Sequence, residues 1–195
     1  MRSPAQLVEA GMFASIIRIW AALTSRTRNV WYRLLGVELR GYGCLRRISI
    51  PRQWREVAIE KDVGLDDGVV LLCSGTFRRE KILIRSGTYL NRYTVVDAHH
   101  QVEIGRNCMI GPHCYITDGN HGMKMSLPIK KQPMTAAPVV IEDDVWLGAG
   151  VIVLKGVRIG RGAVIGAGSV VARNIEPFMI AVGTPARAIG RRADG

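Results

Sequence analysis

From Ile104 onward an aliphatic residue returns every six positions along the chain. These anchors are Ile104, Ile110, Ile116, Ile141, Leu147, Val153, Ile159, Ile165 and Val171, and weaker hexads before them have anchors at Ile59, Leu65, Leu71, Ile84, Leu90 and Val96. The residue after an anchor is often glycine, and the fifth position of each hexad is usually small or β-branched. A period of six matches neither the helical period of 3.6 nor the strand period of 2.

A hexad suits a short strand of about four residues followed by a corner, where glycine permits backbone shapes that other residues resist. Three such sides close a triangular coil, and stacked coils bury the anchors in one continuous core. Fifteen anchors at three per coil predict about five coils, which exceeds the minimum of about three repeats.

The segments Val145-Trp146-Leu147-Gly148-Ala149-Gly150 and Gly183-Thr184-Pro185-Ala186-Arg187 make the pattern specific. The hexads resemble those of the left-handed parallel β-helix acyltransferases over residues from about 59 to 190. The branch they look most like is that of the maltose/galactoside O-acetyltransferases, with similarity to bacterial surface-polysaccharide O-acetyltransferases. The resemblance implies an all-β fold, a left-handed parallel β-helix built as a triangular solenoid of hexapeptide repeats. The left hand comes from the resemblance alone, because physical priors favour right-handed crossovers.

Two breaks in the repeat mark where chemistry is expected. The step from Val96 to Ile104 is eight residues, so two extra residues bulge out near His99, His100 and Gln101. The step from Ile116 to Ile141 is 25, so a loop over residues 117–139 leaves the coil. A catalytic arm and a plain surface insertion are both consistent with such a loop.

His121 lies in this loop beside two glycines. Transfer of an acyl group to a hydroxyl needs a base, and a neutral imidazole with a pKa near 6.5 can take the proton. The resembling families place their catalytic histidine in the loop before the hexad that carries tryptophan, and His121 matches that position. A solvated loop histidine is the alternative, and His99 and His100 are the next bases to test.

The resemblance also implies acetyl-CoA as the acyl donor and assigns residues to it position by position. Trp146 matches the aromatic residue of the acyl and pantetheine channel, and Ala149 and Ala167 match backbone contacts to the thioester end and pantetheine. Ala172 and Arg173 match a Thr-Lys pair at the nucleotide end, where Ala172 lacks the hydroxyl. Arg187 matches a basic residue near the CoA phosphates.

Asn91 and Asp97 stand about where the family places polar contacts to the acceptor. Turn chemistry is an equal alternative, because Asn and Asp favour corners by bonding their own backbone.

No metal site is expected. The four cysteines form no CxxC pair, and the four histidines lack the ligand pair five residues apart found in zinc carbonic anhydrases built on this helix. Cys108 and Cys114 fall on inward positions, where burial raises a thiol pKa, so direct transfer is preferred over an acyl-cysteine intermediate.

The 195 residues, 48% of them hydrophobic, fit one globular domain. Residues 1–58 do not follow the repeat; 5–35 read as one or two helices that cap the open end of a solenoid spanning 59–190. A basic tail is expected at 191–195. An interfacial helix on an anionic membrane is the alternative for the N-terminal segment.

The net charge of +11 invites nucleic-acid binding, but the basic residues are spread from Arg2 to Arg192, so no nucleic-acid partner is expected. We therefore expect a CoA-dependent O-acetyltransferase for a carbohydrate hydroxyl, with surface-polysaccharide or lipid-linked glycan biosynthesis as its candidate pathway. It should be a homotrimer in the cytoplasm, with the inner face of the membrane as a candidate location. Alternatives are acetylation of an antibiotic hydroxyl or an amino-sugar nitrogen, and a non-catalytic binding solenoid.

Overall fold

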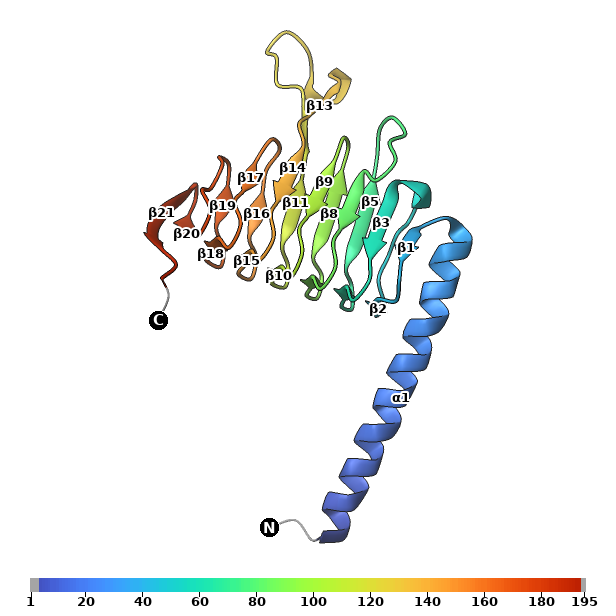
Figure 1. Ribbon diagram of the computed structural model, residues 1–195. Helices are drawn as coiled ribbons and strands as arrows, with labels where there is room; N and C mark the ends of the chain where they lie inside the picture. Colours follow the sequence, from blue (N-terminus) through green and yellow to red (C-terminus); the bar gives the residue numbers. More distant parts are fainter. Residues whose placement is uncertain (1–3, 194–195) are drawn as a thin grey trace.

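The computed structural model describes residues 4–193, with side chains described from residue 20 onward. One helix, α1 (Pro4–Leu35), precedes a stack of short strands (Figure 1). The strands are β1 (Glu38–Arg40), β2 (Cys44–Leu45), β3 (Val57–Glu60), β4 (Gly64–Leu65), β5 (Val70–Cys73), β6 (Ile82–Ile84), β7 (Tyr89–Leu90), β8 (Val95–Ala98), β9 (Val102–Ile104), β10 (Met109–Ile110), β11 (Tyr115–Thr117), β12 (Gly119–His121), β13 (Met134–Ala136), β14 (Val139–Ile141), β15 (Trp146–Leu147), β16 (Ile152–Val153), β17 (Arg158–Ile159), β18 (Val164–Ile165), β19 (Val170–Val171), β20 (Met179–Gly183) and β21 (Ala186–Arg191). Two 3-10 turns, η1 (Trp54–Glu56) and η2 (Ile129–Lys131), complete the elements.

Apart from β12 and β13, which pair with each other, the strands form three sheets that run along the stack, as the hexads predict. Sheet A has the order β1-β3-β6-β9-β14-β17, sheet B β2-β4-β7-β10-β15-β18-β20-β21 and sheet C β19-β16-β11-β8-β5. The pairs are parallel apart from β20 with β21, so each of five complete coils contributes one strand to each sheet. The predicted β-helical solenoid is confirmed.

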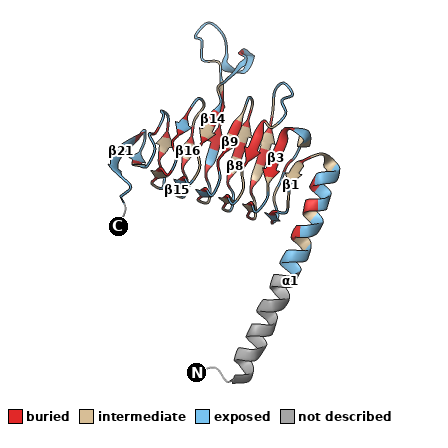
Figure 2. Ribbon diagram, in the orientation of Figure 1, coloured by how far each residue is buried: buried red, intermediate tan, exposed pale blue. Residues whose placement is uncertain are grey.

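The fifteen anchors form three columns inside the solenoid. In sheet A, for example, Ile59 pairs with Ile84, Ile84 with Ile104, Ile104 with Ile141, and Ile141 with Ile159. Each of the fifteen anchor residues is at most 1% exposed, and Figure 2 shows this buried interior along the stack. The inward position of every coil is therefore a packed aliphatic core rather than a channel.

The solenoid begins earlier than residue 59. Strand β1 pairs with β3, β2 pairs with β4, and Ser49 bridges to Val70, so residues 38–50 form an incomplete coil on the open end. The helical segment expected over 1–58 is a single helix that ends at Leu35. Its C-terminal half lies against this incomplete coil, whereas its N-terminal half extends beyond the solenoid (Figure 1).

At the other end β20 turns back into β21, and this antiparallel pair covers the edge of sheet B. Arg191 is the last residue of β21, and Arg192 donates to the Asp144 carboxylate at 2.8 Å. The segment expected as a free basic tail from 191 therefore starts inside the fold. No helix in the described part of the chain combines the length and apolar character needed to cross a bilayer.

Within residues 38–193, extra residues leave the stack at the corner where the chain passes from sheet C to sheet A. The expected excursions are there: the bulge at 99–101 and the loop at 118–138, which projects as an arm built on the antiparallel pair β12–β13 (Figure 1). A third excursion, residues 74–81 between β5 and β6, projects on the same side. Buried Lys81 anchors it by donating to Glu56 Oε1 at 2.9 Å and to the carbonyls of Ser74 and Thr76 at 2.7 Å.

Candidate active site

A cleft of about 680 Å³ lies between the arm and sheet C. It brings His121 together with polar groups of the coils and with apolar side chains of the arm. The lining residues are Asp97, His99, Tyr115, Thr117, Gly119, Asn120, His121, Met123, Ile129, Met134 and Leu154.

The arm is held by hydrogen bonds at its base and its tip. His121 stands opposite Met134 in the β12–β13 pair. At the tip the buried Gln132 amide accepts from the Lys124 N–H and donates to the Lys124 and Leu127 carbonyls, all within 2.9 Å. Lys155 on the following coil donates to Thr135 Oγ1 at 2.7 Å. The arm is thus a built structure rather than a loose insertion, and it fixes the backbone of His121.

The His121 side chain is exposed at the lip of this cleft. Its imidazole makes no hydrogen bond to any residue from 20 to 193. Both ring nitrogens are consequently available to a ligand, as a general base requires.

Asp118 fixes the bulge that forms the other wall, and sequence reasoning gave it no role. Its fully buried carboxylate accepts the backbone N–H groups of His99 (2.6 Å), His100 (2.7 Å) and Gln101 (2.5 Å). The His99 ring packs over Gly119, where a Cβ would lie 2.5 Å from a ring carbon. The Asp118 carboxylate therefore holds the bulge against the base of the arm.

Asp97 presents a carboxylate to the cleft. Its Oδ2 accepts from the Tyr115 hydroxyl at 3.1 Å, while its Oδ1 is buried and has no hydrogen-bond partner among the described residues. His99 Nε2 lies 3.9 Å from this Oδ1. Burial, together with the Asp97 charge, raises the pKa of the Tyr115 phenol, which keeps it a donor. Asp97 and His121 therefore line the same cleft, with the Oδ1 of Asp97 on its buried side.

Asn91 is not brought to this cleft. Its Oδ1 accepts from the Arg92 backbone N–H at 2.7 Å, which is the turn chemistry that the sequence left open for it. His100 is exposed on the bulge outside the cleft, and His113 stacks on Tyr93 with ring centroids 5.2 Å apart. Among the cleft residues only His99 offers a second imidazole.

The residues expected to contact CoA lie on the C-terminal coils and outside the cleft. Trp146 is exposed on β15 in sheet B, and Arg187 is exposed on β21 opposite Val182. Ala172 and Arg173 are exposed and follow β19. They lie at the same corner of the solenoid as the arm, which leaves two coils earlier, after β11.

Ala149 and Ala167 stack on the corner between sheets B and C. The Gly168 N–H donates to the Ala149 carbonyl at 2.8 Å, and both alanines are exposed. The N–H groups of Ala149 and Ala167 donate to no acceptor within the described residues. Two backbone donors without an acceptor among the described residues thus lie on neighbouring coils, at the positions that the resemblance assigns to a thioester and pantetheine.

The cysteines are buried apart from Cys44, and none of the four is in a disulfide. Burial raises the pKa of Cys108 to about 11 and that of Cys73 to about 12, and it also raises the pKa of Cys114. The inward positions expected for Cys108 and Cys114 are confirmed. Between residues 20 and 193 no three His, Cys, Asp or Glu side chains gather into a metal-binding group.

Residues 138–173 match the family described as bacterial transferase hexapeptide (six repeats). The chain carries the hexapeptide repeat of the bacterial transferases. It is 32% identical over 180 residues to a probable acetyltransferase of Mycobacterium tuberculosis, covering 91% of this chain and 57% of that protein. It is 41% identical over 110 residues to the galactoside O-acetyltransferase of Lactococcus lactis, covering 56% of this chain and 52% of that enzyme. The chain thus spans little more than half the length of these curated relatives.

A solved hexapeptide-repeat acetyltransferase of Vibrio cholerae, complexed with acetyl coenzyme A, has the same fold with a TM-score of 0.63. The two are 26% identical, and the match covers 87% of this chain and 78% of the other. The resemblance to hexapeptide-repeat acetyltransferases expected from the sequence is confirmed.

Proposed function

We propose that this protein transfers an acetyl group from acetyl-CoA to a carbohydrate hydroxyl, with His121 as the general base. The observation that carries the proposal is the cleft lined by both the exposed His121 imidazole and the Asp97 carboxylate. The acetyltransferase relatives and the acetyl-CoA held by the Vibrio cholerae neighbour support the donor. The galactoside O-acetyltransferase supports a sugar as acceptor.

The reaction follows from these positions. The Asp97 carboxylate accepts a hydrogen bond from one sugar hydroxyl and orients the ring, while His121 takes the proton of the hydroxyl that reacts. The hydroxyl oxygen attacks the thioester carbonyl, and the C–S bond breaks as the tetrahedral intermediate collapses. The imidazolium then returns its proton to the departing CoA thiolate. The free N–H of Ala149 is the donor we assign to the developing oxyanion.

We further propose that the complete site forms between two copies of the chain in a homotrimer. Within one chain His121 lies on the arm that leaves sheet C, whereas Trp146 lies on sheet B. A donor channel lined by Trp146 can reach His121 when sheet B of one copy faces the arm of its neighbour. Symmetric assembly then creates three equal sites.

The acceptor belongs, on this proposal, to a surface polysaccharide or a lipid-linked glycan that is assembled on the cytoplasmic side of the membrane. A mass-spectrometric screen with acetyl-CoA and a panel of glycans, nucleotide sugars, amino sugars and aminoglycosides identifies it. If the screen finds acetylated amino groups and no ester product, the acceptor atom is a nitrogen and not a hydroxyl oxygen.

The deciding experiment compares His121→Ala with His113→Ala. His113 is an exposed histidine that stacks on Tyr93 outside the cleft, so it is the matched control. Loss of a general base lowers the rate by about 10² to 10⁴, so kcat should fall by that factor in His121→Ala alone. Binding of acetyl-CoA should be unchanged in both variants, because the donor residues lie elsewhere. A His121→Ala enzyme with kcat within threefold of wild type would overturn the assignment.

A further inference from the structure

The part of α1 with described side chains has its polar and apolar faces reversed relative to an ordinary surface helix. The side facing the solenoid carries Ser25, Asn29 and Tyr32, which are buried. Ser25 accepts from the Leu45 N–H at 2.9 Å, and the Asn29 amide donates to the Gly43 carbonyl at 2.8 Å. The Tyr32 hydroxyl donates to the Ile48 carbonyl at 3.0 Å. Polar side chains thus attach the helix to the first coil, where apolar packing is the usual solution.

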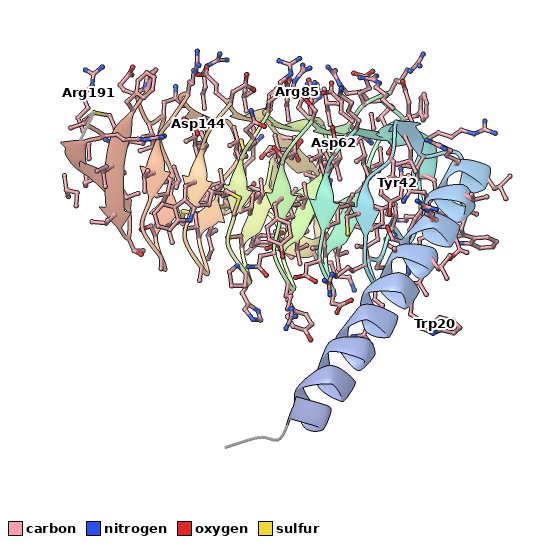
Figure 3. The ribbon with its side chains drawn as sticks, turned by 60° about the horizontal axis from the view of Figure 1, so that its bottom comes forward. Trp20, Tyr42, Asp62, Arg85, Asp144 and Arg191 are labelled. Atoms are coloured by element: carbon pink, nitrogen blue, oxygen red, sulfur yellow. The ribbon has the colours of Figure 1, made fainter. Side chains whose placement is uncertain are left out.

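The opposite side of α1 is an exposed apolar stripe. At 100° per residue the stripe residues fall within an arc of about 100°, centred across the helix from Ser25 and Asn29. Trp20 is 65% exposed, Trp31 59% and Leu34 77%, and Trp20 projects away from the solenoid in Figure 3. The stripe consists of Trp20, Leu23, Val30, Trp31 and Leu34. Exposed apolar surface of this extent on a soluble domain marks a contact surface.

The charge beside the stripe is entirely positive. The sequence contains no Asp or Glu between Glu9 and Glu38. Arg26 and Arg33 lie together on one flank of the stripe, and both are exposed. Arg33 donates to the carbonyls of Leu39 (3.4 Å) and Gly41 (2.9 Å), so its charge is not neutralised there. Neither arginine forms an ion pair with a carboxylate of the described residues.

We propose that this face of α1 docks the protein on an anionic phospholipid surface. The stripe points away from the solenoid, so a flat bilayer can meet it without touching the coils. Tryptophans prefer the membrane–water interface, and arginines beside an apolar stripe bind anionic headgroups. A second copy of the chain is disfavoured as occupant, because two such faces would bring arginine against arginine. The proposal stands on α1 alone and does not depend on the proposed acetyl transfer.

The test measures co-sedimentation of the full chain with vesicles of phosphatidylcholine alone or containing phosphatidylglycerol. Wild type should bind the anionic vesicles at least about tenfold more tightly than the neutral ones, and added salt should weaken this binding. W20S/W31S should lose at least about tenfold in partitioning, since the anchoring aromatic area is removed. Arg26→Gln should lose about fivefold.

Trp146→Ser is the matched control, because Trp146 is an equally exposed tryptophan far from α1 on sheet B. It should bind vesicles like wild type, and circular dichroism and thermal melts should show that all variants are folded. Failure of wild type to bind anionic vesicles would overturn the proposal, as would equal binding to neutral vesicles. Light scattering that shows W20S/W31S losing a defined oligomer while it keeps lipid binding would assign the stripe to a protein contact instead.

Discussion

Replacing Asp118 by alanine should destabilise the corner that carries the cleft. The carboxylate is fully buried, and it is the common acceptor for three consecutive backbone N–H groups of the bulge, those of His99, His100 and Gln101. Alanine removes all three hydrogen bonds together and supplies no substitute acceptor.

The magnitude follows from where those three donors lie. A hydrogen bond to a charged group contributes about 1.5–3 kcal/mol, and a buried donor left without a partner costs about 1–3 kcal/mol. His100 is exposed and its N–H can be rehydrated, whereas His99 and Gln101 are half-buried. Losing the hydrogen bonds to the His99 and Gln101 N–H groups is costly, whereas losing the one to His100 costs little. Together the three losses should lower the free energy of unfolding by about 3–5 kcal/mol. Asp118→Asn keeps one side-chain oxygen and should fall between alanine and wild type.

Two measurements check this, and Asp143→Ala is the control. Asp143 also accepts a backbone N–H, that of Arg106 at 2.6 Å, but its carboxylate is 43% exposed. Denaturant unfolding should give a loss below about 1 kcal/mol for Asp143→Ala. Hydrogen exchange should accelerate at amides 99–101 in Asp118→Ala and remain unchanged in the anchor strands.

The effect should reach activity through His99 and Asp97, which line the cleft. The KM for the acceptor should rise in Asp118→Ala, while the KM for acetyl-CoA should stay near wild type. A loss of stability under 1 kcal/mol, with slow exchange retained at 99–101, would refute the role of this carboxylate.

The remaining predictions concern assembly and the thiols. The His121→Ala and Trp146→Ala variants should each lose activity when expressed alone. When the two are co-expressed in equal amounts, about a quarter of wild-type activity should return. In random assembly about one intersubunit site in four combines an intact His121 from one chain with an intact Trp146 from its neighbour. If the co-expressed mixture regains no activity, His121 and Trp146 of the same chain must form the site. At pH 8 a thiol reagent should label Cys44 alone, because burial disfavours the thiolates of Cys108 and Cys114 by raising their pKa values. Mass spectrometry that finds Cys73, Cys108 or Cys114 labelled in the folded protein would contradict this.

The core was predictable because one position of each hexad must be aliphatic. A coil closes only when its three inward side chains fill the same interior, so the fifteen anchors appear in the sequence as a strict period. The structure buries all fifteen, in the columns that the period implies.

The first coil was missed although part of its signal is present. Leu39 and Leu45 are six apart and stand in register with Ile59 and Leu65. The next step, from Leu45 to buried Ile50, is only five residues, and the arginines between these positions hide the period. The step from Leu71 to Ile84 is 13 residues, close to two hexads of six, so the excursion at 74–81 does not stand out as a break in the repeat.

The role of Asp118 could not be read from the sequence for a different reason. Its partners are backbone groups 17 to 19 residues earlier, and any residue type could supply them. Only the stacking of one coil on the next brings them within reach. The sequence also does not show that Trp146 lies on sheet B while the arm leaves sheet C, because this depends on which side of the triangular coil each hexad forms.

The position of the three excursions explains why the candidate site is where it is. Coils stack at the spacing of neighbouring strands, about 4.8 Å, so insertions at the same corner of successive coils lie side by side. The Arg78 guanidinium donates to Gln101 Oε1 at 2.8 Å, which ties the excursion at 74–81 to the bulge, and Asp118 ties the bulge to the arm. The interior of the solenoid is full, so a substrate pocket has to be built outside it, and residues added at one corner can do so without disturbing the core.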